Sequence, residues 1–97
     1  MPSPNDYASL HAVVRGRVQG VGFREFVIGR AQAARLTGYV RNLPDGGEVE
    51  VVVEGLRIHL EAFLGHLEKG PRLSSVQSVE AHWGAPTGGY PDFGVRF

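Results

Sequence analysis

Apolar and polar residues alternate along three parts of the chain, which is the pattern of strands that bury one face. The first run has its apolar positions at Leu10, Ala12, Val14 and Val18. The second spans Val49 to Val53 among glutamates and follows turn residues at 43–47. Because the β-prone segment 38–42 precedes that turn, we expect a hairpin there. The third run, 76–81, contains a break in alternation that a bulge would explain.

Two other stretches carry apolar residues at helical spacing. The first stretch has these residues at Phe23, Phe26, Val27, Ala31 and Ala34. The second has them at Leu56, Leu60, Phe63, Leu64 and Leu67. It stops at the pair Gly70-Pro71, because glycine ends helices and proline cannot continue them. A short apolar segment, 93–97, predicts a final strand.

The predicted element order is β-α-β-β-α-β with a short terminal strand. Two split βαβ units with right-handed crossovers give an α+β fold, the ferredoxin-like two-layer sandwich. We therefore expect an antiparallel sheet with both helices on one face. The 97 residues suffice for one domain, which we place at 10–97. Residues 1–9, with two prolines and few apolar side chains, are expected to form a flexible lead-in.

Charge and composition narrow the function classes. Ten Lys and Arg balance ten Asp and Glu, which argues against nucleic acid or a membrane surface as partner. The absence of cysteine excludes disulfides, thiolate nucleophiles and cysteine-bound zinc. The first residues lack the basic and apolar parts of a signal peptide, and no apolar run has the length of a membrane span. We therefore expect a cytoplasmic protein, and a monomer.

The segment GRVQGVGFR, Gly16 to Arg24, is the first candidate for chemistry. It lies between the first strand and the first helix, where unpaired helix N–H groups and the helix dipole favour an anion. Glycines at 20 and 22 let the amides turn toward one centre, and Arg24 adds a planar fork for phosphate oxygens. The spacing alone is also compatible with a tight turn and a solvated arginine. Nucleotide-binding motifs do not fit, because Phe23-Arg24 and Glu25 stand where those motifs need other residues.

Other clusters of polar side chains predict no chemistry. His59 and His66 lie seven residues apart on a helix, about 10 Å along its axis, too far to share one metal ion. Glu48, Glu50 and Glu54 alternate along one strand, and we expect them on a wet sheet face. We expect no metal and no cofactor.

Two long segments at the right separation resemble the signatures of the acylphosphatase family. They are GRVQGVGFR and GYVRNLPDGGEVEVVVEG, Gly38 to Gly55, and the likeness continues through FLGHLEKGP and FGVRF. The resemblance implies hydrolysis of small acyl phosphates to carboxylate and inorganic phosphate, on a ferredoxin-like fold. It also implies that Arg24 binds the phosphoryl group and that Asn42 holds the attacking water. The implied phosphate-binding loop comprises Gln19, Gly20, Val21, Gly22 and Phe23.

The chain departs from the family pattern at two places near these signatures. Arg35 stands where the family commonly has a helix-ending glycine, which predicts a strained positive φ. The turn at Gly46-Gly47 is one residue longer than usual. An alternative function is a non-catalytic domain that senses a small anion such as phosphate or carbamoyl phosphate. RNA binding is disfavoured, because the strand EVEVVVE is acidic and aliphatic.

Overall fold

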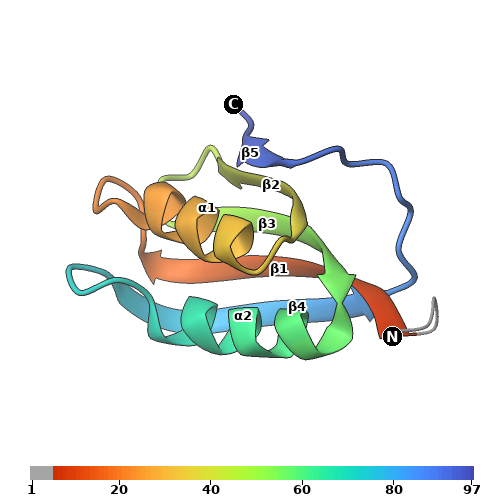
Figure 1. The fold of residues 1–97 in the computed structure, drawn as a ribbon. Helices are drawn as coiled ribbons and strands as arrows, with labels where there is room; N and C mark the ends of the chain where they lie inside the picture. The colour runs from red at the N-terminus through yellow and green to blue at the C-terminus, as the bar shows by residue number, and fades with distance from the viewer. Residues whose placement is uncertain (1–5) are drawn as a thin grey trace.

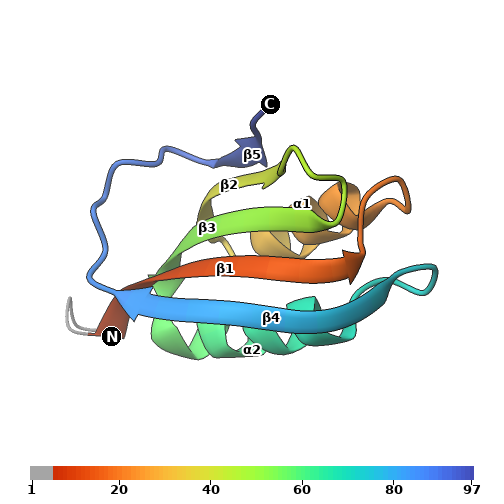
Figure 2. The same ribbon diagram turned by 180° about the vertical axis from the view of Figure 1, so that it is seen from behind.

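Two helices cover one face of a five-stranded sheet and leave the other face open (Figures 1 and 2). A computed structural model describes residues 6–97. The elements are β1 (Tyr7–Arg17), α1 (Phe23–Ala33), β2 (Thr37–Asn42), β3 (Glu48–Leu56), α2 (Arg57–Lys69), β4 (Ser75–Gly84) and β5 (Phe93–Val95). This order and the ferredoxin-like sandwich confirm the prediction from hydrophobic periodicity.

The strands are arranged in the order β4-β1-β3-β2-β5. The four long strands pair antiparallel, as expected, but β5 pairs parallel to β2, so the sheet is mixed. The reason lies in the connection 85–92, which runs along the end of the sheet from the end of β4 to the start of β2 (Figure 1). The chain therefore enters β5 in the direction of β2.

The structure corrects the predicted start of β1 and confirms a predicted bulge at its end. The strand begins at Tyr7, so residues 7–9 of the expected lead-in pair with β3 instead. Residues 1–5 of that lead-in lie outside the described residues. At the other end, Arg15 pairs with Ser78 but Gly16 pairs with Val76, which is the bulge that the broken alternation of the fourth strand predicted. A side chain at Gly16 would collide with the Ser75 carbonyl.

The core lies between the sheet and the two helices. Its largest fully buried side chains are Phe23, Phe63, Leu10, Leu60, Leu67, Val14, Val18, Val27, Val40, Val49, Val51 and Val53. The alternating positions of β1 and β3 and the apolar stripes of α1 and α2 thus meet, as the sequence pattern predicts. This packing fixes the first turn of α1 against the ends of β1 and β2.

Figure 2 shows the face of the sheet that no helix covers. Ion pairs join neighbouring strands on this face. Arg15 on β1 contacts Glu48 on β3 and lies 3.2 Å from Glu80 on β4. Arg41 lies 2.6 Å from Glu50. The glutamates at 48 and 50 are therefore partners in cross-strand pairs on a solvated face, where each pair contributes little, about 0–1 kcal/mol.

Arg35 ends the first helix in the left-handed region, with a φ of 56°. The Arg35 N–H donates to the Gln32 carbonyl at 3.1 Å and the Leu36 N–H donates to the Ala31 carbonyl at 2.9 Å. These two bonds form the Schellman motif, in which glycine normally occupies the Arg35 position because it has no Cβ. The strain expected from the sequence is therefore present.

Replacing Arg35 with glycine should raise the free energy of unfolding by about 0.5–1 kcal/mol. The change relieves the left-handed strain, and the larger chain entropy of glycine offsets part of the gain. A thermal melt should show a midpoint higher by roughly 4 °C. The matched control is Gln32→Gly in the same helix, where φ is not positive, and its midpoint should fall. An unchanged or lower midpoint for Arg35→Gly would contradict this account.

Glu54 is buried, with 6% of its surface exposed, which corrects the expectation of a wet position. The connection 85–92 covers it, and its carboxylate accepts four hydrogen bonds at 2.8–3.0 Å from Thr87 and Gly88. The donors are the Thr87 hydroxyl and two main-chain N–H groups, on Thr87 and Gly88, and no sequence pattern identifies these N–H groups. The carboxylate therefore fixes the connection that leads to β5.

Glu54→Gln should lower the free energy of unfolding by about 2 kcal/mol at neutral pH. This is the contribution to stability that is typical of a hydrogen bond to a charged group. Burial raises the pKa of the Glu54 carboxyl, but the bonds from Thr87 and Gly88 outweigh it, so the pKa lies below its ordinary value of 4.5. The stabilisation is therefore complete above about pH 4.5 and disappears as the pH falls through the lower folded-state pKa.

Urea unfolding of the parent chain and of Glu54→Gln between pH 7 and pH 3 measures this effect. The two stabilities should converge at the acid end. Glu61→Gln, an exposed position on α2, is the matched control and should differ little from the parent at any pH. A constant difference between Glu54→Gln and the parent down to pH 3 would show that the carboxylate charge plays no part.

Candidate functional site

A cavity of about 270 Å³ opens where β1, α1 and β2 meet. Both β1 and β2 run antiparallel to β3, so their carboxyl ends lie at the same edge of the sheet. The chain leaves β1 there, passes through the glycine loop and starts α1. The cavity is lined by Val18, Gly20, Gly22, Phe23, Arg24, Glu25 and Asn42. The fold thus brings the two sequence signatures to one place.

The glycines of the loop are required by the backbone. Gly20 has a φ of 73° and Gly22 a φ of 75°, both in the left-handed region. A Cβ at either position would meet no atom within 4 Å, so the space is open and only the dihedral angle demands glycine. Left-handed residues alternating with ordinary ones turn main-chain N–H groups toward a common concave side, where an anion can bind.

The N-terminus of α1 begins at Gly22, the N-cap residue. Among residues 6–97, no side chain caps it with a hydrogen bond. The N–H of Phe26 donates to the Gly22 carbonyl at 3.1 Å, so the N–H groups before it have no partner within the helix. Those groups belong to Phe23, Arg24 and Glu25, three residues that line the cavity at the positive end of the helix dipole. The cavity therefore favours a negatively charged ligand.

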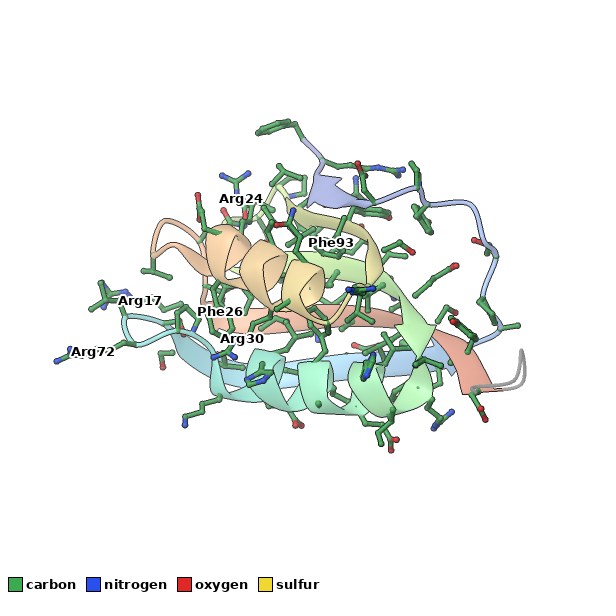
Figure 3. The ribbon with its side chains drawn as sticks, viewed as in Figure 1. Arg17, Arg24, Phe26, Arg30, Arg72 and Phe93 are labelled. Carbon is green, nitrogen blue, oxygen red and sulfur yellow. The ribbon has the colours of Figure 1, made fainter. Side chains whose placement is uncertain are left out.

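Arg24 lies in that first turn and is half-buried. Its guanidinium forms no ion pair with any residue in 6–97. It lies 5.7 Å from the centre of the ring of Phe97, on the side of α1 near the C-terminal residue (Figure 3). A guanidinium keeps its charge at all relevant pH values and binds two oxygens of one phosphate in its planar fork. A permanent cation thus borders a set of unpaired N–H groups.

Asn42 is the last residue of β2, and its carboxamide oxygen is buried in the cavity wall. This oxygen, Oδ1, accepts no hydrogen bond within the described part of the chain. Buried acceptors without a partner are rare, and each costs about 1–3 kcal/mol. A carboxamide oxygen is a weak base but a good acceptor, so it can orient a molecule that donates an O–H.

Gln19 and Val21 complete the predicted loop but do not line the cavity. The side chain of Gln19 donates to the Leu43 carbonyl at 2.9 Å and to the Glu48 carbonyl at 2.8 Å, which joins the loop to the β2–β3 hairpin. Val21 packs against the core. Their side chains therefore hold the loop in place, and the role of their main-chain N–H groups stays a prediction.

The turn between β2 and β3 also supports the loop. The Gly16 N–H donates to the Gly47 carbonyl at 3.1 Å, so this turn contacts the end of β1. Arg17, which we expected to be a solvated charge at the strand end, is exposed and extends away from the cavity (Figure 3).

Sequence reasoning missed two residues of the cavity wall. Val18 was assigned only to the core, although it both packs there and borders the cavity. Glu25 was noted only because it breaks a nucleotide-binding motif. The sequence did place Glu25 in the first turn of the predicted helix, where the helix dipole stabilises an acidic side chain. That position could have indicated that Glu25 lies beside the predicted anion site.

Residues 6–97 contain neither a metal-binding cluster nor a membrane-spanning helix. No group of three or more His, Cys, Asp or Glu side chains there has the geometry to hold a metal ion. In the same residues, neither helix has the length and apolar character needed to cross a membrane.

Comparisons with known proteins match this geometry to one family. The sequence profile described as Acylphosphatase matches residues 10–95. A protein named acylphosphatase from Thermus thermophilus is 54% identical, covering 81% of this chain and 89% of its own length. A protein of the same name from Dehalococcoides mccartyi is 45% identical, and the match covers 90% of this chain and 96% of that protein. The crystal structure of acylphosphatase from Bacillus subtilis has a TM-score of 0.88 and 33% identity, covering 93% of this chain and 99% of that one.

Proposed function

The chain belongs to the acylphosphatase family and hydrolyses acyl phosphates, and we propose that Arg24, Asn42 and the amides of the glycine loop perform this reaction without a metal ion. The observation that carries the proposal is the shared cavity of an uncapped helix N-terminus, an unpaired guanidinium and an unpartnered carboxamide oxygen. Each of these three groups has a separate part in the reaction.

The phosphoryl group binds to the loop and to Arg24. Phosphoryl transfer passes through a loose transition state, so catalysis depends on positioning and on stabilising charge at the equatorial oxygens. Main-chain N–H groups from Gly20 to Glu25 and the Arg24 fork surround the place where those oxygens would lie. In comparable oxyanion sites, one fixed donor contributes about 3 kcal/mol to the transition state.

The attacking water donates a hydrogen bond to Asn42 Oδ1. Its oxygen forms a bond to phosphorus while the bond between phosphorus and the acyl oxygen breaks. Because Asn42 is too weak a base to remove a proton, an oxygen of the substrate's own phosphate accepts the proton of the water. The pH–rate profile should therefore show no requirement for a deprotonated enzyme group near neutrality.

The leaving group explains why no general acid is needed. An acyl phosphate releases a carboxylate, a weak base that departs without a proton. A phosphate monoester with an alkoxide leaving group needs a general acid or a metal ion, and the roles proposed here for Arg24, Asn42 and the loop N–H groups include neither. Small acyl phosphates are therefore the substrates that the cavity fits, and simple monoesters should be poor ones.

Turnover of acetyl phosphate and benzoyl phosphate in the presence of EDTA tests this proposal. We expect the purified protein to hydrolyse both at rates that EDTA does not change, and to leave glycerol phosphate intact. Loss of activity in EDTA, with recovery on adding a divalent cation, would contradict the metal-free mechanism. Phosphate binding without turnover would favour the anion-sensing alternative.

We also propose that the enzyme works as a monomer in the cytoplasm. All catalytic groups named above come from one chain, so no second subunit is needed to complete the cavity. Light scattering during gel filtration should give the mass of a single chain. A dimer mass at micromolar concentration would contradict the proposed monomer.

A further inference from the structure

A second cavity lies on the helical side of the molecule, in the groove between α1 and α2. Its volume is about 200 Å³. Its apolar wall comes from alanines on both helices, Ala33 and Ala62 among them, and from Phe63. Because alanine side chains end at Cβ, the two helices cannot fill the groove between them. The space is therefore a consequence of small residues at these positions.

Basic side chains supply the polar wall of this groove. Arg30 reaches it from α1, and His59 and His66 reach it from α2 (Figure 3 shows Arg30). None of the three forms an ion pair with a residue in 6–97, and no acidic side chain lines the groove. The guanidinium of Arg30 stacks 5.5 Å from the ring centre of Phe26, which limits its freedom. An unpaired cation thus stands beside an apolar wall.

The two histidines occupy the same helical face because they lie seven residues apart. That separation, about 10 Å along the axis, prevents them from sharing one metal ion. It does allow both imidazoles to border one elongated groove, one toward each end. The histidines that the sequence left without a role therefore belong to a single cavity with Arg30.

We propose that this groove binds a small monocarboxylic acid with an apolar tail. The carboxylate accepts hydrogen bonds from the Arg30 fork and from the N–H group of one imidazole, and the tail lies on the wall of Ala62 and Phe63. Inorganic phosphate lacks the apolar part. Nucleotides are too large, since cavities for drug-sized ligands hold roughly 300–1,000 Å³.

The groove is separate from the catalytic cavity. Arg30 lies in the last turn of α1, whereas the catalytic cavity lies at its first turn. The two share no lining residue. Six residues separate Arg24 from Arg30, which corresponds to about 9 Å along the helix. Occupation of one site can therefore be measured while the other is saturated.

Benzoate is a suitable probe, and isotope-labelled protein reports where it binds. A titration followed by amide chemical shifts is carried out in saturating inorganic phosphate, which occupies the catalytic cavity. We expect the shifts to occur along residues 30–34 and 59–66. Neutral benzamide, which keeps the ring but lacks the charge, should bind roughly tenfold more weakly or worse. The chemical shifts measure benzoate binding directly, so the result does not depend on hydrolysis of an acyl phosphate.

Two variants test the two walls of the groove. Arg30→Gln should weaken benzoate binding by roughly tenfold or more, as expected for a lost charged hydrogen bond. Lys69→Gln, which removes a cation of α2 that does not line the groove, should change benzoate affinity by less than about twofold. Ala62→Leu should fill the groove and abolish binding while the chain stays folded. Benzoate shifts confined to residues 18–25 and 42, or equal affinity in Arg30→Gln, would overturn the proposal.

Discussion

Arg24→Ala should lower kcat/KM for benzoyl phosphate by about 10³-fold. Arg24 is the one cation that lines the catalytic cavity, and it forms no ion pair within residues 6–97 that would hold it elsewhere. Arginines that stabilise phosphoryl transfer typically contribute about 10³–10⁵ in rate. In the proposed mechanism the guanidinium contacts the phosphoryl group in both the bound substrate and the transition state, so KM should rise and kcat should fall.

Steady-state kinetics with benzoyl phosphate, together with binding of inorganic phosphate, provides the measurement. Arg24→Lys should recover only part of the loss, because an ammonium group cannot replace the planar fork. The matched control is Arg17→Ala, an exposed arginine at the end of β1 that extends away from the cavity. It should retain nearly full activity. Equal kinetic losses in Arg17→Ala and Arg24→Ala would mean that general charge, not the position of Arg24, matters.

Asn42→Ala should lower kcat by about 10²–10³-fold and leave KM almost unchanged. In the proposed mechanism the carboxamide oxygen orients the water, whereas the loop and Arg24 bind the phosphoryl group. Substrate binding should therefore survive the loss of the Asn42 side chain. A rise in KM with kcat intact would assign Asn42 to substrate binding and contradict its role with water.

The same variant makes a second, independent prediction about stability. Asn42 Oδ1 is buried without a partner in residues 6–97, a cost that folding must bear. Removing it should leave the free energy of unfolding unchanged or higher while activity falls. The matched control is Gln19→Ala, whose side chain makes two hydrogen bonds to the hairpin. That variant should lower stability, and its activity should fall through loss of loop position.

Much of the fold follows from local pattern in this chain. The valines at 49, 51 and 53 are fully buried, as their alternation with glutamates requires. The apolar residues at helical spacing likewise predicted α1 and α2. The parallel pairing of β5 was missed because the connection 85–92 has no periodicity, and the buried carboxylate of Glu54 fixes it through contacts distant in sequence. Long-range bonds of this kind leave no local signal.

The sequence predicted the candidate site best at the positions where the backbone conformation requires a particular residue type. Gly20 and Gly22 have the left-handed angles that their residue type suggests. The pairing of β2 with β3 brings Asn42 to the edge where Arg24 lies. The 17 residues between Arg24 and Asn42 carry no sequence pattern that predicts this proximity without knowledge of the fold. The side chain of Gln19 could equally have faced the anion, and its contacts with the hairpin became clear only in three dimensions.

The mechanism depends on a phosphoryl group that sits among the loop amides and Arg24, with a water held by Asn42. A crystal structure of the protein with phosphate or vanadate tests this directly. We predict that the oxyanion accepts hydrogen bonds from main-chain N–H groups of residues 20–25 and from both arms of Arg24, with a water between it and Asn42 Oδ1. An oxyanion bound elsewhere, with Arg24 extended into solvent and the loop amides unoccupied, would contradict it.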